Sequence, residues 1–165
     1  VNTIDVAINL HRMKLAPDGL IYVSSRGDYY GTKSDVFVID PEAQRVVGRL
    51  GVAASEMCMD GDELYLISVE WSYVSGKNEI RYTLYDTRKR EILPRNFITD
   101  GTEKEISIPY GLGVNPETKE IFVSDATNYV TPGYLYCFSP EGKLKWKVRT
   151  GDIPAHFAFT SADFY

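Results

Sequence analysis

Short apolar runs separated by turn-forming clusters follow one another along the whole chain. Runs rich in β-branched and aromatic residues are typical of strands, and Pro, Gly, Asn and Asp between them favour tight turns. The stretch 108–148 shows this pattern most clearly, with Asn115-Pro116 and Pro140-Glu141-Gly142 at two of its turns. It predicts a four-stranded antiparallel meander, with strands at 110–114, 120–124, 134–139 and 143–148.

The same succession of turn and strand recurs upstream. A turn precedes a β-rich triplet at 21–23, at 64–66 and at 121–123, and a third strand with its own turn follows each triplet. The repeat has a period of about 48 residues, and four strands per unit at such a period are typical of a β-propeller. We therefore predict an all-β chain, a β-propeller built of four-stranded antiparallel blades.

The predicted blade boundaries follow from aligning the units. Residues 1–10 align with the last strand of a unit, so we expect the outer strand of a preceding blade there. Because a ring needs roughly four to eight blades, about three and a half blades suggest the C-terminal half of a seven-bladed ring, within one propeller domain. Blades are expected at 11–54, 55–109 and 110–154, and the inner strand of a closing blade at 155–165.

The predicted first strands alternate between large apolar residues and small or polar ones, which favours packing of one face between blades. The apolar positions expected to pack in this way are Met13, Leu15, Met57, Met59, Leu112, Val114, Phe157 and Phe159. A charge inside a sheet stack needs a partner or water. We therefore expect a solvated or salt-bridged channel lining formed by Arg12, Lys14, Glu56 and His156. No metal-ligand spacing surrounds His11 or His156, and both are predicted to be packed or channel histidines.

The connections on the two sides of each unit differ in length. Those between second and third strands, 24–35, 69–81 and 125–134, are long and place aromatic residues beside polar ones, whereas the opposite connections are tight turns. Aromatic faces with a few orienting polar groups are typical of binding sites. The predicted ligand-binding residues are Arg26, Tyr29, Tyr30, Trp71, Tyr73, Tyr110, Asn128 and Tyr129. The alternative is that these tyrosines cap the sheet ends without a ligand.

Composition and charge narrow the possible partners. The net charge is −5 and the isoelectric point about 5.1, which argues against nucleic acid, because phosphate binding needs a basic stripe. The one basic run, 88–90, lies in a predicted turn. No apolar run approaches the roughly 20 residues of a membrane-spanning helix. We therefore expect neither a nucleic-acid partner nor a membrane-spanning segment.

The residue patterns of the common catalytic sites are missing. Ser124-Asp125 lies in no nucleophile elbow, and neither a phosphate-binding glycine loop nor a calcium-loop spacing is present. We assign no catalytic residue, no metal ligand and no cofactor.

The repeats also carry a family resemblance. NPETKEIFVSDA (115–126), GYLYCFSPEGKLKWKVRTGDIP (133–154) and VFVIDPEAQRVVGRLGV (36–52) make the chain resemble the YncE-like, surface-layer-type seven-bladed propellers. More narrowly, it resembles a propeller family of Bacteroidetes cell-surface lipoproteins whose function is largely unknown. The resemblance implies an exported, lipid-anchored binding protein at the outer membrane or cell surface, without enzymatic activity. Some relatives work beside TonB-dependent transporters and capture a nutrient, so a cobamide or a glycan is an expected ligand.

Two other functions remain open. Gluconolactonase-like propellers share the pattern GxLYxFxPxG found at 133–142, and they hold a divalent cation on the axis. In that family an Asn ligand stands where this chain has Tyr110, and tyrosine is a poor ligand for a hard cation. Glu56 is then the only plausible axial carboxylate. The third function is that of a protein-interaction or surface-scaffold propeller, since aromatic residues on one rim would serve a protein partner equally well.

Overall fold

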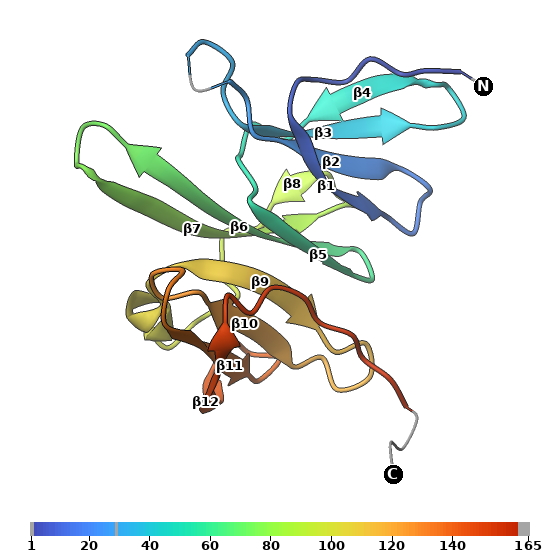
Figure 1. The fold of residues 1–165 in the computed structure, drawn as a ribbon. Coiled ribbons are helices and arrows are strands. Elements are labelled where there is room, and N and C mark those ends of the chain that lie inside the picture. Colours follow the sequence, from blue (N-terminus) through green and yellow to red (C-terminus); the bar gives the residue numbers. More distant parts are fainter. Residues whose placement is uncertain (1, 29, 162–165) are drawn as a thin grey trace. The chain divides into compact units, whose positions relative to one another are not determined.

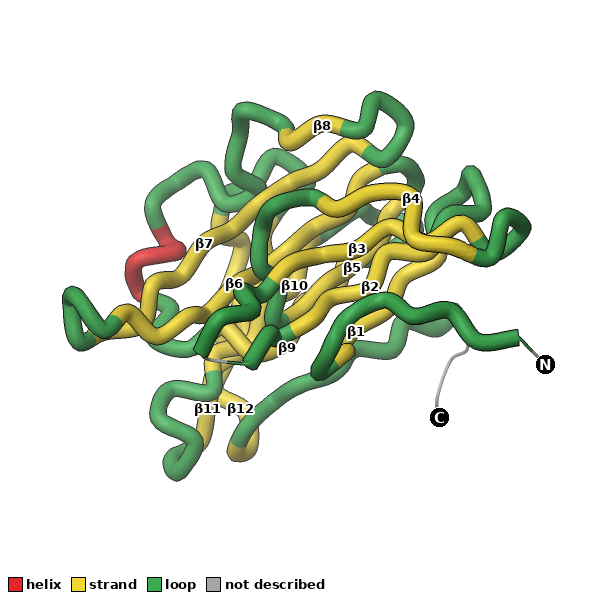
Figure 2. Tube along the Cα trace, turned by 90° about the horizontal axis from the view of Figure 1, so that it is seen from above, coloured by secondary structure: helices red, strands yellow, loops and turns green. Residues whose placement is uncertain are grey.

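The computed structural model describes residues 2–28 and 30–161. These residues form three four-stranded antiparallel sheets, each a meander in chain order, with almost no helix (Figure 2). This confirms the predicted fold class. Blade 1 holds β1 (Leu10–Leu15), β2 (Ile21–Ser25), β3 (Asp35–Asp40) and β4 (Arg45–Arg49). Blade 2 holds β5 (Glu56–Asp60), β6 (Glu63–Ser72), β7 (Lys77–Asp86) and β8 (Glu91–Ile92). Blade 3 holds β9 (Pro109–Val114), β10 (Ile121–Asp125), β11 (Pro132–Phe138) and β12 (Leu144–Asp152).

The chain divides into two compact units. The first, Val1–Phe97, contains blades 1 and 2, and the second, Ile98–Tyr165, contains blade 3 and the short 3-10 helix η1 (Thr102–Glu105). None of the described residues forms a helix that is both long and apolar enough to cross a membrane.

The short turns are held by side chains that accept backbone hydrogen bonds. Asp18 Oδ1 accepts from the N–H of Leu20, and Asp40 Oδ1 accepts from two N–H groups in the next turn. Asn115 Oδ1 likewise accepts from two backbone N–H groups in the turn between β9 and β10. Asp and Asn at the first position of a turn stabilise it in this way, which explains why these connections are tight and polar.

The core of the first unit lies between blades 1 and 2. Tyr22 and Val36 of blade 1 pack with Met57 and Leu66 of blade 2, and all four are fully buried. The Tyr22 ring meets the Tyr85 ring edge to face, with centroids 5.9 Å apart. The first strand of blade 2 therefore turns its large apolar side chains towards the blade that precedes it in the chain.

The first strand of blade 1 departs from the predicted packing. Met13 and Leu15 are each 65% exposed. Their pairing partners on β2 show that they are register equivalents of Met57 and Met59 on β5. The equivalent face of β5 is covered by blade 1, whereas the described residues place no blade against this face of β1. Burial of this face depends on a neighbouring blade and not on the strand's own pattern, so the packing of Met13 and Leu15 between blades stays a prediction.

Blade 3 has a segment packed against its first two strands. Ser124 Oγ donates a hydrogen bond to the carbonyl of Pro154, and the Phe122 ring contacts the rings of Phe157 and Phe159 at 6.0 and 5.5 Å. A side-chain carbon at Gly111 would collide with the backbone carbonyl of residue 155. The glycine is therefore required for the close approach of the two backbones.

No strand is assigned to residues 2–9 or 154–161, although an outer and an inner strand are predicted there. A strand is recognised by its hydrogen-bond ladder with a neighbour, and neither segment pairs with a described strand. The assignment of these two segments to further blades stays a prediction.

The connection between β6 and β7 is a long hairpin rather than the loop predicted over 69–81. Pairing continues outward to Trp71 opposite Asn78 and Ser72 opposite Lys77, and only a four-residue turn, 73–76, remains. Val69-Glu70-Trp71 has the alternation and the residue types that fit a strand. The hairpin therefore extends outward from blade 2 (Figure 1).

Candidate functional site

The connections between second and third strands present exposed aromatic side chains in all three blades. Tyr30 in the β2–β3 connection is 98% exposed, Tyr73 at the β6–β7 turn is 83% exposed, and Tyr129 in the β10–β11 connection is 48% exposed. The opposite connections carry Asp, Asn, Pro and Gly instead. We call the end of each blade that bears the second-to-third connection its long-connection end.

In blade 1 the long connection is shaped by one carboxylate. Asp28 Oδ1 accepts hydrogen bonds from the backbone N–H groups of Tyr30, Gly31 and Thr32. These bonds lower the pKa of Asp28 to about 2, because they favour the charged form. The conformation that exposes Tyr30 is therefore fixed by local hydrogen bonds. Tyr29, the neighbouring predicted site residue, lies outside the described residues.

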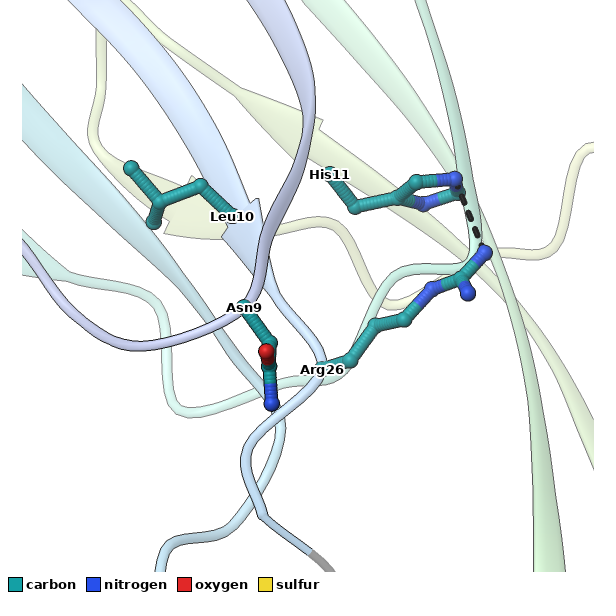
Figure 3. Close-up of a pocket in the computed structure, with 4 residues that line it drawn as sticks. All are labelled: Asn9, Leu10, His11 and Arg26. Carbon is teal, nitrogen blue, oxygen red and sulfur yellow. Dashed lines mark hydrogen bonds between the residues drawn. The ribbon is translucent and has the colours of Figure 1, made fainter.

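A shallow depression of about 330 Å³ opens beside this connection, lined by Asn9, Leu10, His11 and Arg26 (Figure 3). The guanidinium of Arg26 donates from Nη2 to Nε2 of His11 over 2.8 Å. The Asn9 amide donates to the carbonyl of Gly27, and the Arg26 backbone N–H donates to the carbonyl of Asn9. These bonds join the segment before β1 to the start of the β2–β3 connection.

His11 is neutral in this arrangement. A guanidinium has no acceptor, so Nε2 accepts the bond and the proton lies on Nδ1. Nδ1 is buried and has no hydrogen-bond partner within the described part of the chain. The pKa of His11 is lowered by burial first, and then by the positive charges of Arg26 and Arg12.

Sequence reasoning did not place His11 or Asn9 at a site. The signal that could have found them is the pairing of β1 with β2. Leu10 pairs with Ser25 in an antiparallel register, so Arg26 lies opposite Asn9 and diagonally from His11. Without that register, His11 could be predicted only as a packed or channel histidine.

A salt bridge links the first strands of blades 1 and 2. Arg12 Nη2 lies 2.8 Å from Glu56 Oε2, and Arg12 Nε donates to the same oxygen over 2.9 Å. The Glu56 side chain is only 7% exposed, and its other oxygen accepts from the backbone N–H of Met57. This pair confirms a salt bridge between two of the four charged residues, and their lining of a channel stays a prediction.

Trp71 and Tyr73 occupy the end of the β6–β7 hairpin. Trp71 is 55% exposed although it pairs within β6. No hydrogen bond or ring contact joins either of them to Tyr30 within residues 2–28 and 30–161. Each of the two long connections of this unit therefore presents its own aromatic surface.

In the second unit, two of the predicted residues meet. The rings of Tyr110 and Tyr129 pack edge to face with centroids 5.6 Å apart, and both are partly exposed. Asn128 does not offer its side-chain oxygen to a ligand. That oxygen accepts from the backbone N–H groups of Val130 and Thr131 and from the Thr131 hydroxyl. The side-chain oxygen of Asn128 therefore shapes the loop and does not act as the predicted orienting group for a ligand.

Comparison with known proteins identifies the fold. No protein-family model matches the chain, and no curated protein sequence matches it. Among solved structures, hydrazine synthase of Kuenenia stuttgartiensis matches 94% of this chain and 40% of its own, at 15% identity and a TM-score of 0.59. The Dos1 propeller matches 89% of this chain and 39% of its own, at 15% identity and a TM-score of 0.54. The chain is part of a β-propeller.

A third match comes from Bacteroides thetaiotaomicron. Its quinonprotein alcohol dehydrogenase-like protein covers 87% of this chain and 34% of its own, at 18% identity and a TM-score of 0.54. At such identities the likeness shows the fold alone. The chain spans well under half the length of the structures that it matches. The narrower resemblance to Bacteroidetes surface lipoproteins stays a prediction.

Proposed function

We propose that this propeller is a non-enzymatic binding protein of the cell surface that captures a small ligand beside an outer-membrane transporter. The observation that carries the proposal is the set of exposed aromatic side chains at the long-connection ends, with Tyr30, Trp71 and Tyr73 in the first unit. Large exposed aromatic residues of this kind, beside orienting polar groups, are typical of binding surfaces.

The local structure of the β2–β3 connection supports a binding role. Asp28 accepts hydrogen bonds from three backbone N–H groups, so residues 30–32 are held before any ligand arrives. A surface ordered in advance loses less conformational entropy on binding. The backbone of Tyr30 is therefore held in place while its ring is exposed to solvent and available for stacking.

The salt bridge and hydrogen bond formed by Glu56 argue against a lactonase-like hydrolase. Its carboxylate is held by Arg12 at 2.8 Å and by the Met57 N–H, so the one candidate axial carboxylate already has a cationic partner. Tyr110, which stands in the place of an Asn ligand, packs on Tyr129 instead. The alcohol dehydrogenase-like neighbour is too distant in sequence to transfer an activity.

Export, a lipid anchor and a TonB-dependent transporter as partner belong to the proposal and rest on the family resemblance. A cobamide or a glycan as ligand has the same basis. Both ligands have apolar faces that stack on aromatic rings, which agrees with the residues exposed at the long-connection ends.

A protein-interaction scaffold is the second candidate. The β6–β7 hairpin favours it, because its end carries Trp71, Tyr73 and the fully exposed Val74. Trp and Tyr are the residues most often found at the energetic centres of protein interfaces.

The thermal unfolding midpoint of the complete protein separates these functions. A ligand that binds only the folded state raises the midpoint by mass action. We expect a rise with one member of a panel of cobamides and glycans, and none on exchanging a chelator for calcium or manganese. A rise with the cation alone would support the hydrolase instead. If neither a cation nor any member of the panel raises the midpoint, the result would favour a protein partner.

A further inference from the structure

We infer that the depression formed by Asn9, Leu10, His11 and Arg26 is a subsite for an anionic group of the ligand, a carboxylate or a phosphate. The inference rests on the proposed binding function and adds to it the charge of the ligand. It concerns blade 1 alone, where all four lining residues belong to one compact unit.

The charge of Arg26 is not neutralised within the described residues. Arg26 is exposed, and its guanidinium forms no ion pair there; its one side-chain partner is the neutral ring of His11. Arg12, the other nearby guanidinium, is instead paired with Glu56. A guanidinium held by a neutral acceptor keeps its full positive charge and most of its N–H donors for another partner.

The position of Arg26 is fixed before a ligand binds. Its backbone N–H donates to the carbonyl of Asn9, and its own carbonyl accepts from the Ser34 hydroxyl over 3.0 Å. The His11 ring then orients the guanidinium at the depression, as Figure 3 shows. Planar guanidinium groups held in one orientation bind carboxylate and phosphate groups with two parallel hydrogen bonds.

The lining has the chemistry that an anion requires. No carboxylate is among the four lining residues, although the chain as a whole carries a net charge of −5. The buried Nδ1 of His11 has no hydrogen-bond partner in the described parts of the chain. Because this atom is buried, it does not face the depression, and the exposed guanidinium of Arg26 is the donor that the subsite offers.

The size of the depression sets what it can hold. At about 330 Å³ it accepts one charged group with part of a ring, at the small end of ligand sites. Tyr30 extends from the same connection, four positions after Arg26, and is almost fully exposed. The ring of Tyr30 is not among the lining residues, so the inference rests on Arg26 and the depression alone.

The test uses the complete protein and three probes: galacturonate, the neutral sugar galactose, and inorganic phosphate. We expect galacturonate or phosphate to bind with a calorimetric signal and galactose to bind at least about tenfold more weakly. Arg26→Gln should weaken binding of the anionic probe about tenfold or more, and Arg26→Lys should retain part of the affinity. Lys33→Gln removes an exposed charge of the same connection and should leave the affinity unchanged.

The outcomes separate this inference from the proposed function. If galacturonate binds and phosphate does not, the subsite is assigned to carboxylates. If phosphate binds and galacturonate does not, it is assigned to phosphates. Equal binding of galacturonate and galactose, or unchanged affinity in Arg26→Gln, overturns the anionic subsite while leaving a ligand-binding propeller in place. If none of the probes binds, the subsite is refuted, and the wider ligand panel alone decides the proposed function.

Discussion

At the scale of single residues, contacts at the long-connection end of blade 1 depend on how its strands pair. His11 meets Arg26 because β1 pairs with β2, and Asp28 holds its own connection by three backbone hydrogen bonds. Arg26 and Tyr30 could be predicted as site residues from their place in a long polar connection. His11 and Asn9 could not, because their neighbours are defined by pairing between separate stretches of chain.

The lowered pKa of His11 predicts a pH dependence of stability. The unfolded chain binds a proton near pH 6.5, whereas the folded chain resists it because of burial and the charges of Arg26 and Arg12. As pH falls from about 7.5 to 5.5, the unfolded state takes up the proton first, so the free energy of unfolding should decrease. Urea titrations should show a smaller decrease in His11→Gln. His156→Gln, at an exposed position, is the control for loss of a histidine, and an unchanged pH dependence in His11→Gln would refute the prediction.

Removing the Asp28 carboxylate should disorder the β2–β3 connection without unfolding blade 1. Asp28→Ala leaves three N–H groups without their acceptor, while the strands on either side keep their ladder. We expect faster amide hydrogen exchange over residues 30–32 and weaker ligand binding, with a nearly unchanged unfolding midpoint. Asp18→Ala, in a short turn of the same blade, is the matched control. Unchanged exchange at 30–32 would show that Asp28 does not hold the connection.

At the scale of elements, the Arg12–Glu56 pair joins the first strands of two consecutive blades. Glu56 is buried, so a variant that lacks only Arg12 leaves a carboxylate without its cationic partner. The sequence indicated only that charges on the first strands need a partner or water, and the pairing of Arg12 with Glu56 is a finding of the structure. By contrast, the length of the β6–β7 hairpin was not predicted, because Ser, Gly and Lys near its end have the composition of a loop, whereas pairing between its two arms decides the structure.

Breaking the pair from one side should cost more than removing both partners. We expect Arg12→Leu to lower the free energy of unfolding by about 3 kcal/mol, the range for a broken buried ion pair, and Arg12→Leu with Glu56→Leu to recover part of that loss. Denaturant titration of the two single variants and the double variant measures the coupling. A double variant whose loss of stability relative to wild type equals the sum of the two single losses would show that the pair is not coupled.

Gly111 tests the close packing of residues 154–159 on blade 3. An added methyl group would meet the backbone carbonyl of residue 155, so Gly111→Ala should destabilise the protein by about 2 kcal/mol, as overpacking does. Gly151→Ala, whose added carbon would lie in open space, is the control and should change the midpoint little. Equal midpoints for the two variants would mean that the backbones are not in contact there.

At the scale of the whole molecule, the repeat period alone predicts the propeller, because each blade is one supersecondary unit with the same turns and strands. What the period does not predict is burial at the first strand. Met13 and Leu15 have the same pattern as Met57 and Met59, yet they are largely exposed, because burial of this face requires a blade on its other side. The long connections indicate which end of each blade is specialised, but not the chemistry of a ligand.

Ligand binding at the long-connection ends is tested most directly by calorimetric titration of the complete protein with the ligand that the thermal screen selects. Wild type is compared with Tyr30→Ala/Trp71→Ala and with Glu42→Ala/Glu117→Ala, which alters exposed residues in the opposite connections. We predict that the aromatic double variant binds at least about tenfold more weakly while both variants unfold at the wild-type midpoint. Unchanged affinity in Tyr30→Ala/Trp71→Ala would contradict the assignment of ligand binding to the long-connection ends.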